Sequence, residues 1–223
     1  MLWDIDLTLV DYSGTGRRWY SDALTRVVGL PMRHVPEFAG RTERSLVVEL
    51  FTAHGVDHDD DHIERFFAEL TALAAADLAM LPELGRALAG ASEILASLAS
   101  RNDVVQSLVT GNLPEVAGHK LAAFGLDTHI DLTIGGYGSI SVHRHDLVGE
   151  AITLATAKHG AFDAVVVIGD TPADVTAALH HSAVAVGVAT GRFSAAALAE
   201  SGAHAVLPDL ADTPTVLKTL LTR

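Results

Sequence analysis

The sequence contains no cysteine. This absence excludes disulfide bonds, thiolate nucleophiles, cysteine-ligated zinc and iron–sulfur clusters. Aromatic residues make up only 5% of the 223 residues, so a core must be built mainly from Ala, Leu and Val. Basic residues are also few, because 15 Lys and Arg stand against 28 Asp and Glu, a net charge of −13. Such an acidic surface argues against nucleic acids and anionic membranes as partners.

Long hydrophobic runs are missing as well. No apolar run approaches the length of a membrane span, and no basic segment followed by an apolar stretch opens the chain. Apolar residues nevertheless make up 49% of the sequence, and the mean hydropathy is +0.30, which indicates a buried core. The length suits one α/β domain with a substantial insert. We expect a cytoplasmic protein, either a monomer or a homodimer.

The pattern of apolar residues changes once along the chain. Residues 13–101 repeat apolar side chains at helical spacing, with glycines at the expected helix ends. This region predicts four helices, at Arg17–Gly29, Arg41–His54, Asp59–Met80 and Pro82–Arg101. The acid–histidine run of residues 57–62 resembles a metal cluster. We favour helix capping instead, because Asp residues at a helix start bind free N–H groups and suit the helix dipole.

Residues 102–207 alternate short apolar runs with helical segments. The predicted strands are Val104–Val109, Asp131–Ile134, Ala164–Ile168, Ala183–Val188 and Ala205–Leu207. The predicted helices are Leu113–Phe124, Asp146–His159, Pro172–His181 and Ser194–Ser201. Strands rich in β-branched residues that alternate with helices predict a parallel sheet buried on both faces. Ligands of such sheets bind outside the carboxyl ends of the strands, so we expect catalytic and binding residues directly after each strand.

Two acids stand in the first strand segment. Asp4 and Asp6 are two positions apart, so they point to the same side of an extended chain. Two carboxylates this close repel unless a cation lies between them or one is protonated. An exposed alternating strand would explain the same pattern, so this motif alone decides little.

Two further strand ends carry polar residues. Thr110, Gly111 and Asn112 follow one strand and open a helix, and a hydroxyl with backbone amides at a helix start can bind an anion. An ordinary capped turn is an equal alternative. Asp170 follows another strand, and Asp174 lies about one helical turn later. Helix capping would explain the presence of one of these two acids, but it explains the pair less well.

A basic residue completes the set. Arg144 lies between two histidines and is the only Lys or Arg between Lys120 and Lys158. Acids after the first and third strand ends could hold a hard divalent cation. The hydroxyl, the glycine amide and the arginine could bind the oxygens of a phosphoryl group. An Asp beside that group could attack it and form an aspartyl-phosphate.

Together these motifs resemble the haloacid dehalogenase superfamily. The resemblance covers the whole chain and is closest to phosphoglycolate phosphatase-like enzymes with a helical cap. Residues 4–8 match the first motif, residues 110–112 the second and residues 169–174 the fourth. The resemblance implies an α/β fold with a doubly wound parallel core domain, residues 1–12 and 88–223, and an inserted helical cap domain, residues 13–87.

The resemblance also implies a role for each matched residue. Asp4 would be the nucleophile. Asp6 would be the general acid and then the base, and its backbone carbonyl would bind Mg²⁺. Asp170 would be a magnesium ligand, with Asp174 supporting the ion directly or through water. Thr110 would hydrogen-bond the phosphoryl group, with Gly111 and Asn112 beside it as substrate-binding residues.

Three departures from the family pattern stand out. The third motif usually carries Lys, whereas the matching region here has Arg144; Lys120 is the alternative. Leu7 replaces the usual Gly of the first motif. Only three residues precede Asp4, so we expect a short first strand, unless the natural start lies upstream.

The expected activity is magnesium-dependent hydrolysis of a small phosphomonoester. Arginines of the cap are candidate contacts for the substrate, with Arg41 assigned among Arg17, Arg18, Arg41 and Arg44. A phosphomutase of the same superfamily and a catalytically impaired phospho-ligand-binding homologue are the alternatives. The acid set disfavours a dehalogenase, and the lack of a cap lysine disfavours a phosphonatase. The helical insert disfavours a phospho-receiver domain.

Overall fold

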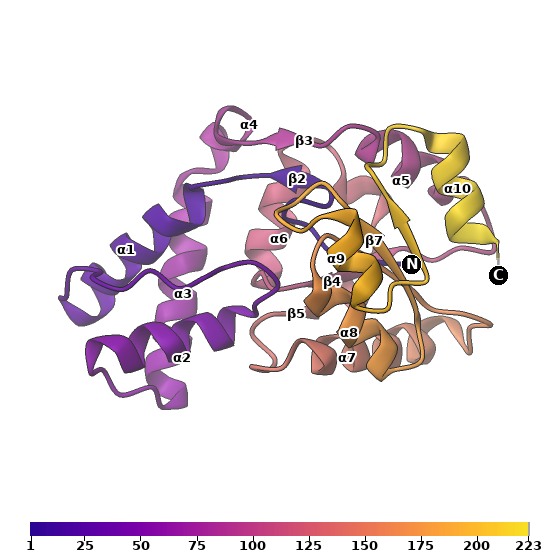
Figure 1. Ribbon diagram of the computed structural model, residues 1–223. Helices are drawn as coiled ribbons and strands as arrows, with labels where there is room; N and C mark the ends of the chain where they lie inside the picture. Colours follow the sequence, from indigo (N-terminus) through magenta and orange to yellow (C-terminus); the bar gives the residue numbers. More distant parts are fainter. Residues whose placement is uncertain (223) are drawn as a thin grey trace.

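The computed structural model describes residues 1–222. Its centre is a six-stranded sheet, which Figure 1 shows flanked by helices. The strand order is β5-β4-β1-β6-β7-β8, and every pairing is parallel. The strands are β1 (Leu2–Trp3), β4 (Ser107–Thr110), β5 (Gly136–Tyr137), β6 (Val166–Gly169), β7 (Val184–Val188) and β8 (Ala205–Leu207). The short first strand is therefore central, between β4 and β6, so the residues that follow these three strands lie side by side.

Helices cover both faces of the sheet. One layer holds α5 (Ala91–Ala99), α6 (Pro114–Ala122) and α10 (Thr213–Leu221), and the other holds α7 (Arg144–His159), α8 (Pro172–His180) and α9 (Ala195–Glu200). Successive residues of a strand face opposite layers. Trp3 accordingly packs in the core of the first layer, and its neighbour Leu2 packs in the core of the second. Apolar residues on both faces of the strands thus produce the three-layer arrangement.

A helical unit, which we call the helical cover, is inserted between β2 (Val10–Asp11) and β3 (Arg86–Ala87). These two strands form a separate antiparallel pair. The cover consists of α1 (Thr15–Val28), α2 (Glu43–His54) and α3 (Asp60–Ala76), and it lies to one side of the sheet (Figure 1). Its few aromatic rings gather at its centre, where Phe66 packs edge-on against Tyr20 and Phe51. The predicted fold class, a parallel α/β core with an inserted helical unit, is confirmed.

One predicted helix, Pro82–Arg101, is wrong. The chain instead forms η1 (Leu78–Met80), α4 (Leu81–Leu84), β3 and then α5. Two glycines account for the break. A Cβ on Gly85 would lie 2.4 Å from the Tyr12 ring, and a Cβ on Gly90 would lie 1.8 Å from the Leu210 carbonyl oxygen. These close approaches, together with the pairing to β2, outweigh the local helical pattern.

The predicted strand Asp131–Ile134 is also wrong. Two short 3₁₀ helices, η2 (Asp127–His129) and η3 (Leu132–Ile134), occupy this region, and the strand β5 follows at Gly136–Tyr137. The cause is local, because the Asp131 carboxylate accepts hydrogen bonds from both the amide and the hydroxyl of Thr133. Such side-chain-to-backbone bonds compete with strand pairing.

The acid–histidine run, residues 57–62, caps a helix as expected. The Asp59 side chain accepts the His62 amide at the start of α3, and Asp60 and Asp61 occupy the first turn. Within residues 1–222, this run contributes to no cluster of three candidate metal ligands. No helix of this part of the chain combines the length and the apolar character needed to cross a membrane.

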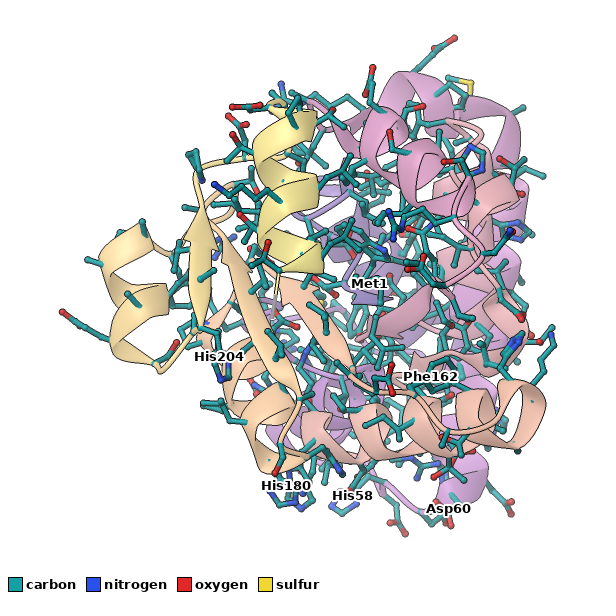
Figure 2. The ribbon with its side chains drawn as sticks, turned by 90° about the vertical axis from the view of Figure 1, so that its right-hand side faces the viewer. Met1, His58, Asp60, Phe162, His180 and His204 are labelled. Carbon is teal, nitrogen blue, oxygen red and sulfur yellow. The ribbon has the colours of Figure 1, made fainter. Side chains whose placement is uncertain are left out.

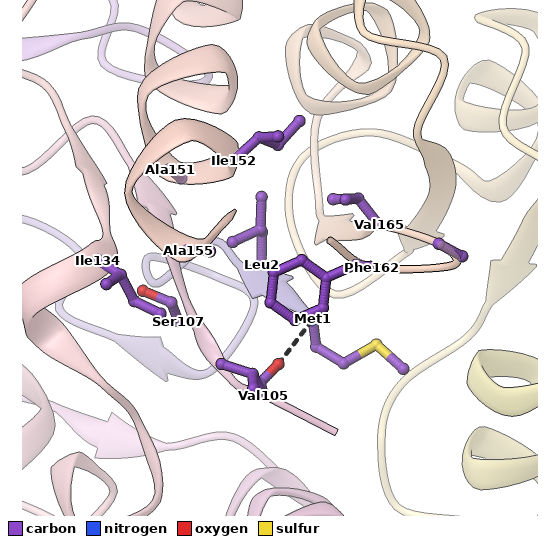
Figure 3. Close-up of a pocket in the computed structure, with 11 residues that line it drawn as sticks. Met1, Leu2, Val105, Ser107, Ile134, Ala151, Ile152, Ala155, Phe162 and Val165 are labelled. Carbon is purple, nitrogen blue, oxygen red and sulfur yellow. Dashed lines mark hydrogen bonds between the residues drawn. The ribbon is translucent and has the colours of Figure 1, made fainter. Parts of the chain in front are cut away.

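A small cavity of about 30 Å³ lies at the amino end of the sheet. Met1 lies between the two helix layers (Figure 2) and donates from its α-amino group to the Val105 carbonyl oxygen at 2.8 Å (Figure 3). Leu2, Phe162 and Val165 line the apolar wall. The cavity is at the opposite end of β1 from Asp4, and it offers no cluster of catalytic side chains.

Candidate active site

The carboxyl ends of β1, β4 and β6 bring three predicted site residues to one edge of the sheet. Asp4 directly follows β1, Thr110 ends β4, and Asp170 directly follows β6. Their positions are fixed by the sheet itself, since the Asp4 amide donates to the Ile168 carbonyl oxygen at 2.8 Å. All three side chains are buried. The three residues therefore lie together at the edge where parallel sheets usually bind ligands.

Three carboxylates form a cluster at this edge. Asp4, Asp170 and Asp174 each place one oxygen within 4.8 Å of the others, and within residues 1–222 they are the one such group of three. Asp4 is 6% exposed, and Asp170 and Asp174 are each 2% exposed. Arg144, the first residue of α7, donates at 2.8 Å to both Asp4 Oδ1 and Asp174 Oδ1. One guanidinium against three carboxylates leaves the cluster short of positive charge.

Asp170 shows this shortage most clearly. Its Oδ1 atom is buried and has no hydrogen-bond partner, an arrangement that is costly unless another group binds the oxygen. Burial, together with the neighbouring carboxylates of Asp4 and Asp174, raises the pKa of Asp170 to about 9. Burial likewise raises the pKa of Asp4 to about 7, although Arg144 opposes this shift. An oxygen-lined site of this kind suits a hard divalent cation.

Asp174 serves the helix and the cluster together. At the start of α8 its Oδ2 atom accepts hydrogen bonds from the Thr171 amide and hydroxyl, at 3.1 Å and 2.7 Å. In return, the Thr171 hydroxyl oxygen accepts a hydrogen bond from the Asp174 amide. This is a reciprocal capping box. Since Arg144 binds its other oxygen, Asp174 has both oxygens occupied. The close approach requires Gly169, where a Cβ would lie 2.2 Å from Asp174 Cγ.

Asp6 faces a different set of partners. Its two oxygens accept hydrogen bonds from Lys120 Nζ at 2.8 Å and 2.7 Å, and Asn112 Nδ2 donates to Oδ2 at 2.7 Å. The side chain is 42% exposed, and its carboxylate is not part of the acid cluster. Leu7, between the two acidic residues and β2, has φ of 62°, in the left-handed region where glycine is usual.

The second strand end supplies hydroxyl and amide groups. Thr110 Oγ1 accepts from the Asn112 amide and from its side-chain nitrogen, at 3.3 Å and 2.8 Å. The Gly111 and Gly138 carbonyl oxygens accept from the Glu43 and Arg44 amides, each at 2.9 Å. The first turn of α2 therefore rests directly on the loop that holds Thr110. A Cβ on Gly138 would lie 1.7 Å from the Gly111 carbonyl oxygen.

The two basic candidates for the third motif have separate places. Arg144 contacts Asp4 and Asp174, whereas Lys120 contacts Asp6 and Asn112. Arg144 is therefore the basic residue in contact with Asp4, whereas Lys120 is in contact with Asp6.

Most of the arginines that were predicted to contact the substrate form hydrogen bonds or ion pairs with other residues. Arg41 lines the cleft, but its guanidinium donates to Ser45 and Glu49 of α2. Arg18 pairs with Asp77. Arg44 similarly donates to Ser139, Asp60 and Glu64. Arg17 is exposed at the cleft. The structure therefore brings Arg41 to the cleft wall without leaving its guanidinium free.

Sequence reasoning missed Glu43. This residue begins α2, lines the cleft and accepts a hydrogen bond from the Tyr20 hydroxyl. Burial raises the pKa of Glu43 to about 7, while the Tyr20 bond and the charge of Lys120 act in the opposite direction. An acid in the first turn of a helix looks like an ordinary dipole partner, so no sequence signal distinguishes it.

A cleft of about 430 Å³ connects these groups. Its floor is the sheet edge with Asp4, Asp6, Thr110 and Asp170. Its opposite wall comes from the helical cover and nearby loops, which contribute Tyr12, Trp19, Tyr20, Phe38, Leu46 and Leu70. The acid cluster is thus buried at the bottom of a space large enough for a small molecule.

Comparisons with known proteins agree with this architecture. The model for haloacid dehalogenase-like hydrolases matches residues 1–179, and a second HAD-hydrolase-like model matches residues 147–213. No curated protein matches the sequence.

Solved structures share the fold at low identity. A hydrolase from Pseudomonas syringae is 24% identical, with a TM-score of 0.70 over 98% of this chain and 97% of its own. A structure described as a predicted phosphoglycolate phosphatase from Haemophilus somnus is 20% identical, with a TM-score of 0.68 over 96% and 95%. One described as a candidate beta-phosphoglucomutase from Bacteroides vulgatus is 18% identical, with a TM-score of 0.65 over 98% and 87%. Since the family model spans most of the sequence, the chain belongs to the haloacid dehalogenase-like hydrolases.

Proposed function

We propose that the protein is a magnesium-dependent phosphatase that hydrolyses a small phosphomonoester through an aspartyl-phosphate on Asp4. The observation that carries the proposal is the buried cluster of Asp4, Asp170 and Asp174 with Arg144, at the bottom of the cleft. The cluster combines an acid that can attack phosphorus with a deficit of positive charge. A bound cation would make up this deficit, and positive charge is needed where an anionic substrate meets an anionic nucleophile.

The residues present fit a divalent cation. The unpartnered Oδ1 atom of Asp170 is the main indication, and Asp4 and the Asp6 backbone carbonyl would complete the protein ligands. Asp174 would support the ion, because both of its oxygens already bind Thr171 and Arg144. When bound, Mg²⁺ would supply positive charge that stabilises the phosphoryl group in the transition state and keeps Asp4 ionised.

In both half-reactions Asp4 makes or breaks the bond to phosphorus, and Asp6 transfers the proton. An Asp4 oxygen bonds to phosphorus while the bond from phosphorus to the leaving oxygen breaks, and Asp6 gives that oxygen its proton. Water then bonds to phosphorus, loses a proton to Asp6 and releases Asp4. Thr110 and the Gly111 amide orient the phosphoryl oxygens. Arg144 holds Asp4 in place and compensates part of the charge.

The expected substrate is a small phosphorylated metabolite, with the leaving group in the cleft beneath the helical cover. Phosphoglycolate is one candidate, because a structural neighbour is described as a phosphatase of that compound. A phosphomutase is the second candidate, since another neighbour of the same fold is described as a mutase. A mutase would return an isomeric phosphate ester rather than free phosphate, so the product separates the two activities.

The test is phosphate release from a panel of phosphorylated metabolites and p-nitrophenyl phosphate, with Mg²⁺ and with EDTA. We expect turnover that requires Mg²⁺ and that falls by at least about 10³-fold in Asp4→Asn. Asp209→Asn is the matched control, since this half-buried side chain accepts a hydrogen bond from the Ala211 amide and does not line the cleft. Unchanged turnover in Asp4→Asn would overturn the proposal. Absence of turnover in the wild-type protein would favour the impaired phospho-ligand-binding homologue instead.

A further inference from the structure

Lys120 is a buried cation that the four family motifs do not include. It lies in the last turn of α6, is 7% exposed, and its ammonium lies 5.8 Å from the centre of the Tyr12 ring. Its Nζ atom donates to both oxygens of Asp6 and, at 2.7 Å, to Asn112 Oδ1. A buried ammonium is costly unless its donors are satisfied. Here three hydrogen bonds on two neighbouring side chains satisfy it.

The site therefore pairs each aspartate of the first motif with its own cation. Arg144 reaches Asp4 from α7, and Lys120 reaches Asp6 from α6, on the other face of the sheet. Asn112 joins the second pair to the phosphoryl-binding loop, because its side-chain nitrogen donates to both Asp6 Oδ2 and Thr110 Oγ1. The Asp6 carboxyl group is thereby directed toward Lys120 and away from the acid cluster.

We propose that Lys120 is the positioning residue of Asp6. It holds the Asp6 carboxyl group on the leaving-group side of the cleft, from which Asp6 exchanges protons with the leaving oxygen and then with water. This inference rests on the proposed phosphatase function. In this role Lys120 only donates hydrogen bonds, and the proton that moves is the one on Asp6.

The contact with both oxygens makes this role workable in each half-reaction. A protonated carboxyl group has one oxygen that donates and one that still accepts. Because the Lys120 ammonium is within hydrogen-bond distance of either Asp6 oxygen, it can stay bonded to one oxygen while the other carries the proton. The carboxyl group can therefore change its protonation state without changing its direction.

A purely structural role for Lys120 would affect all substrates equally, which gives the test. Release of p-nitrophenolate needs little proton donation, whereas release of an alkoxide depends on it. We would measure the first turnover of p-nitrophenyl phosphate and of glycerol 2-phosphate in wild-type protein and in Lys120→Met with Mg²⁺. We expect glycerol phosphate cleavage to fall by about 10²-fold, while the p-nitrophenolate burst changes by less than about threefold.

Two further variants make the result decisive. Lys120→Arg keeps the charge and should recover part of the glycerol phosphate rate. Adding Lys120→Met to Asp6→Asn should cost less than about threefold beyond Asp6→Asn alone, because the two residues act as a unit. This double variant also leaves no unpaired buried charge if Lys120→Met alone folds poorly. Equal losses for both substrates, or additive losses in the double variant, would overturn the inference. Failure of the proposed function is separate, since it shows as wild-type protein without Mg²⁺-dependent turnover.

Discussion

Arg144 Nη2 donates a 2.8 Å hydrogen bond to Asp4 Oδ1, a residue 140 positions earlier in the sequence. The same guanidinium donates through Nε to Asp174, so one side chain joins the ends of β1 and α8. A planar fork with several fixed donors can make both contacts at once, whereas an ammonium is a single point of charge. Arg144, which stands where the family usually has lysine, therefore makes two contacts that depend on the several donors of a guanidinium.

Arg144→Lys should impair both activity and stability. We expect kcat to fall by about 10- to 100-fold, because the shorter cation cannot hold Asp4 and Asp174 together. Weakening a buried pair should also lower the free energy of unfolding, by up to about 3 kcal/mol. Arg101→Lys is the matched control, since Arg101 pairs with Asp103 at the surface. Urea unfolding and steady-state kinetics measure the two effects, and wild-type values in Arg144→Lys would contradict the bridging role.

Asp170→Asn should separate stability from cation binding. Removing a buried acid that lies against two other carboxylates should raise the melting temperature of the metal-free protein. The same change removes a proposed magnesium ligand, so Mg²⁺ should no longer raise the melting temperature. A thermal-shift series with and without Mg²⁺ measures both effects. A variant that is destabilised without metal yet still responds to Mg²⁺ would show that this acid is not a ligand.

Glu43 should make stability fall as pH rises toward neutrality. Burial raises its folded pKa to about 7 from an ordinary 4.5, so between these values the folded state binds more protons than the unfolded state. The contribution of this group to stability therefore decreases from about pH 4.5 to about pH 7 and stays low above it. Glu43→Gln should be more stable than wild type at pH 8, by about 1–3 kcal/mol, and equal to it near pH 4.

Chemical unfolding at several pH values measures this difference. Glu200→Gln, at the exposed end of α9, is the control and should show no such pH dependence. A gain in Glu43→Gln that is the same at pH 5 and pH 8 would mean that the ionised carboxylate is not the destabilising form.

Gly138→Ala should disrupt the contact between the helical cover and the loop that follows Thr110. The added Cβ would lie 1.7 Å from the Gly111 carbonyl oxygen and 2.7 Å from the Glu43 amide nitrogen. We expect a loss of about 1–3 kcal/mol in stability, together with a raised KM. Gly118→Ala, inside α6, meets only Leu132 at 3.7 Å and should be neutral or stabilising. Similar behaviour of the two variants would argue against a tight junction.

The sequence was informative where the signal is periodic. Apolar runs predicted the strands that lead to Thr110 and Asp170, and the general rule for parallel sheets predicted that their ends meet at one edge. Helix signals were reliable where side chains cap the backbone, as Asp59 and Thr171 do.

Pairings between distant side chains were beyond the sequence. Nothing local shows that Lys120 faces Asp6 rather than Asp4, because 114 positions separate the two partners. The local sequence also does not show that Gly90 lies against the Leu210 backbone, a contact that interrupts the helical pattern. The predicted strand at Asp131–Ile134 was wrong for the opposite reason. There the Thr133 amide donates a short-range hydrogen bond to the Asp131 side chain, and this local structure forms in place of the strand.

Leu7 gives the turn that directly follows Asp6 an unusual property. At φ of 62° a leucine has far fewer backbone alternatives than a glycine, and the Thr190 hydroxyl donates to its carbonyl oxygen at 2.5 Å. The conformational entropy of this turn is therefore low both before and after substrate binds. The path of the chain from Asp6 to β2 is then set by the backbone itself, and ligands need not organise it.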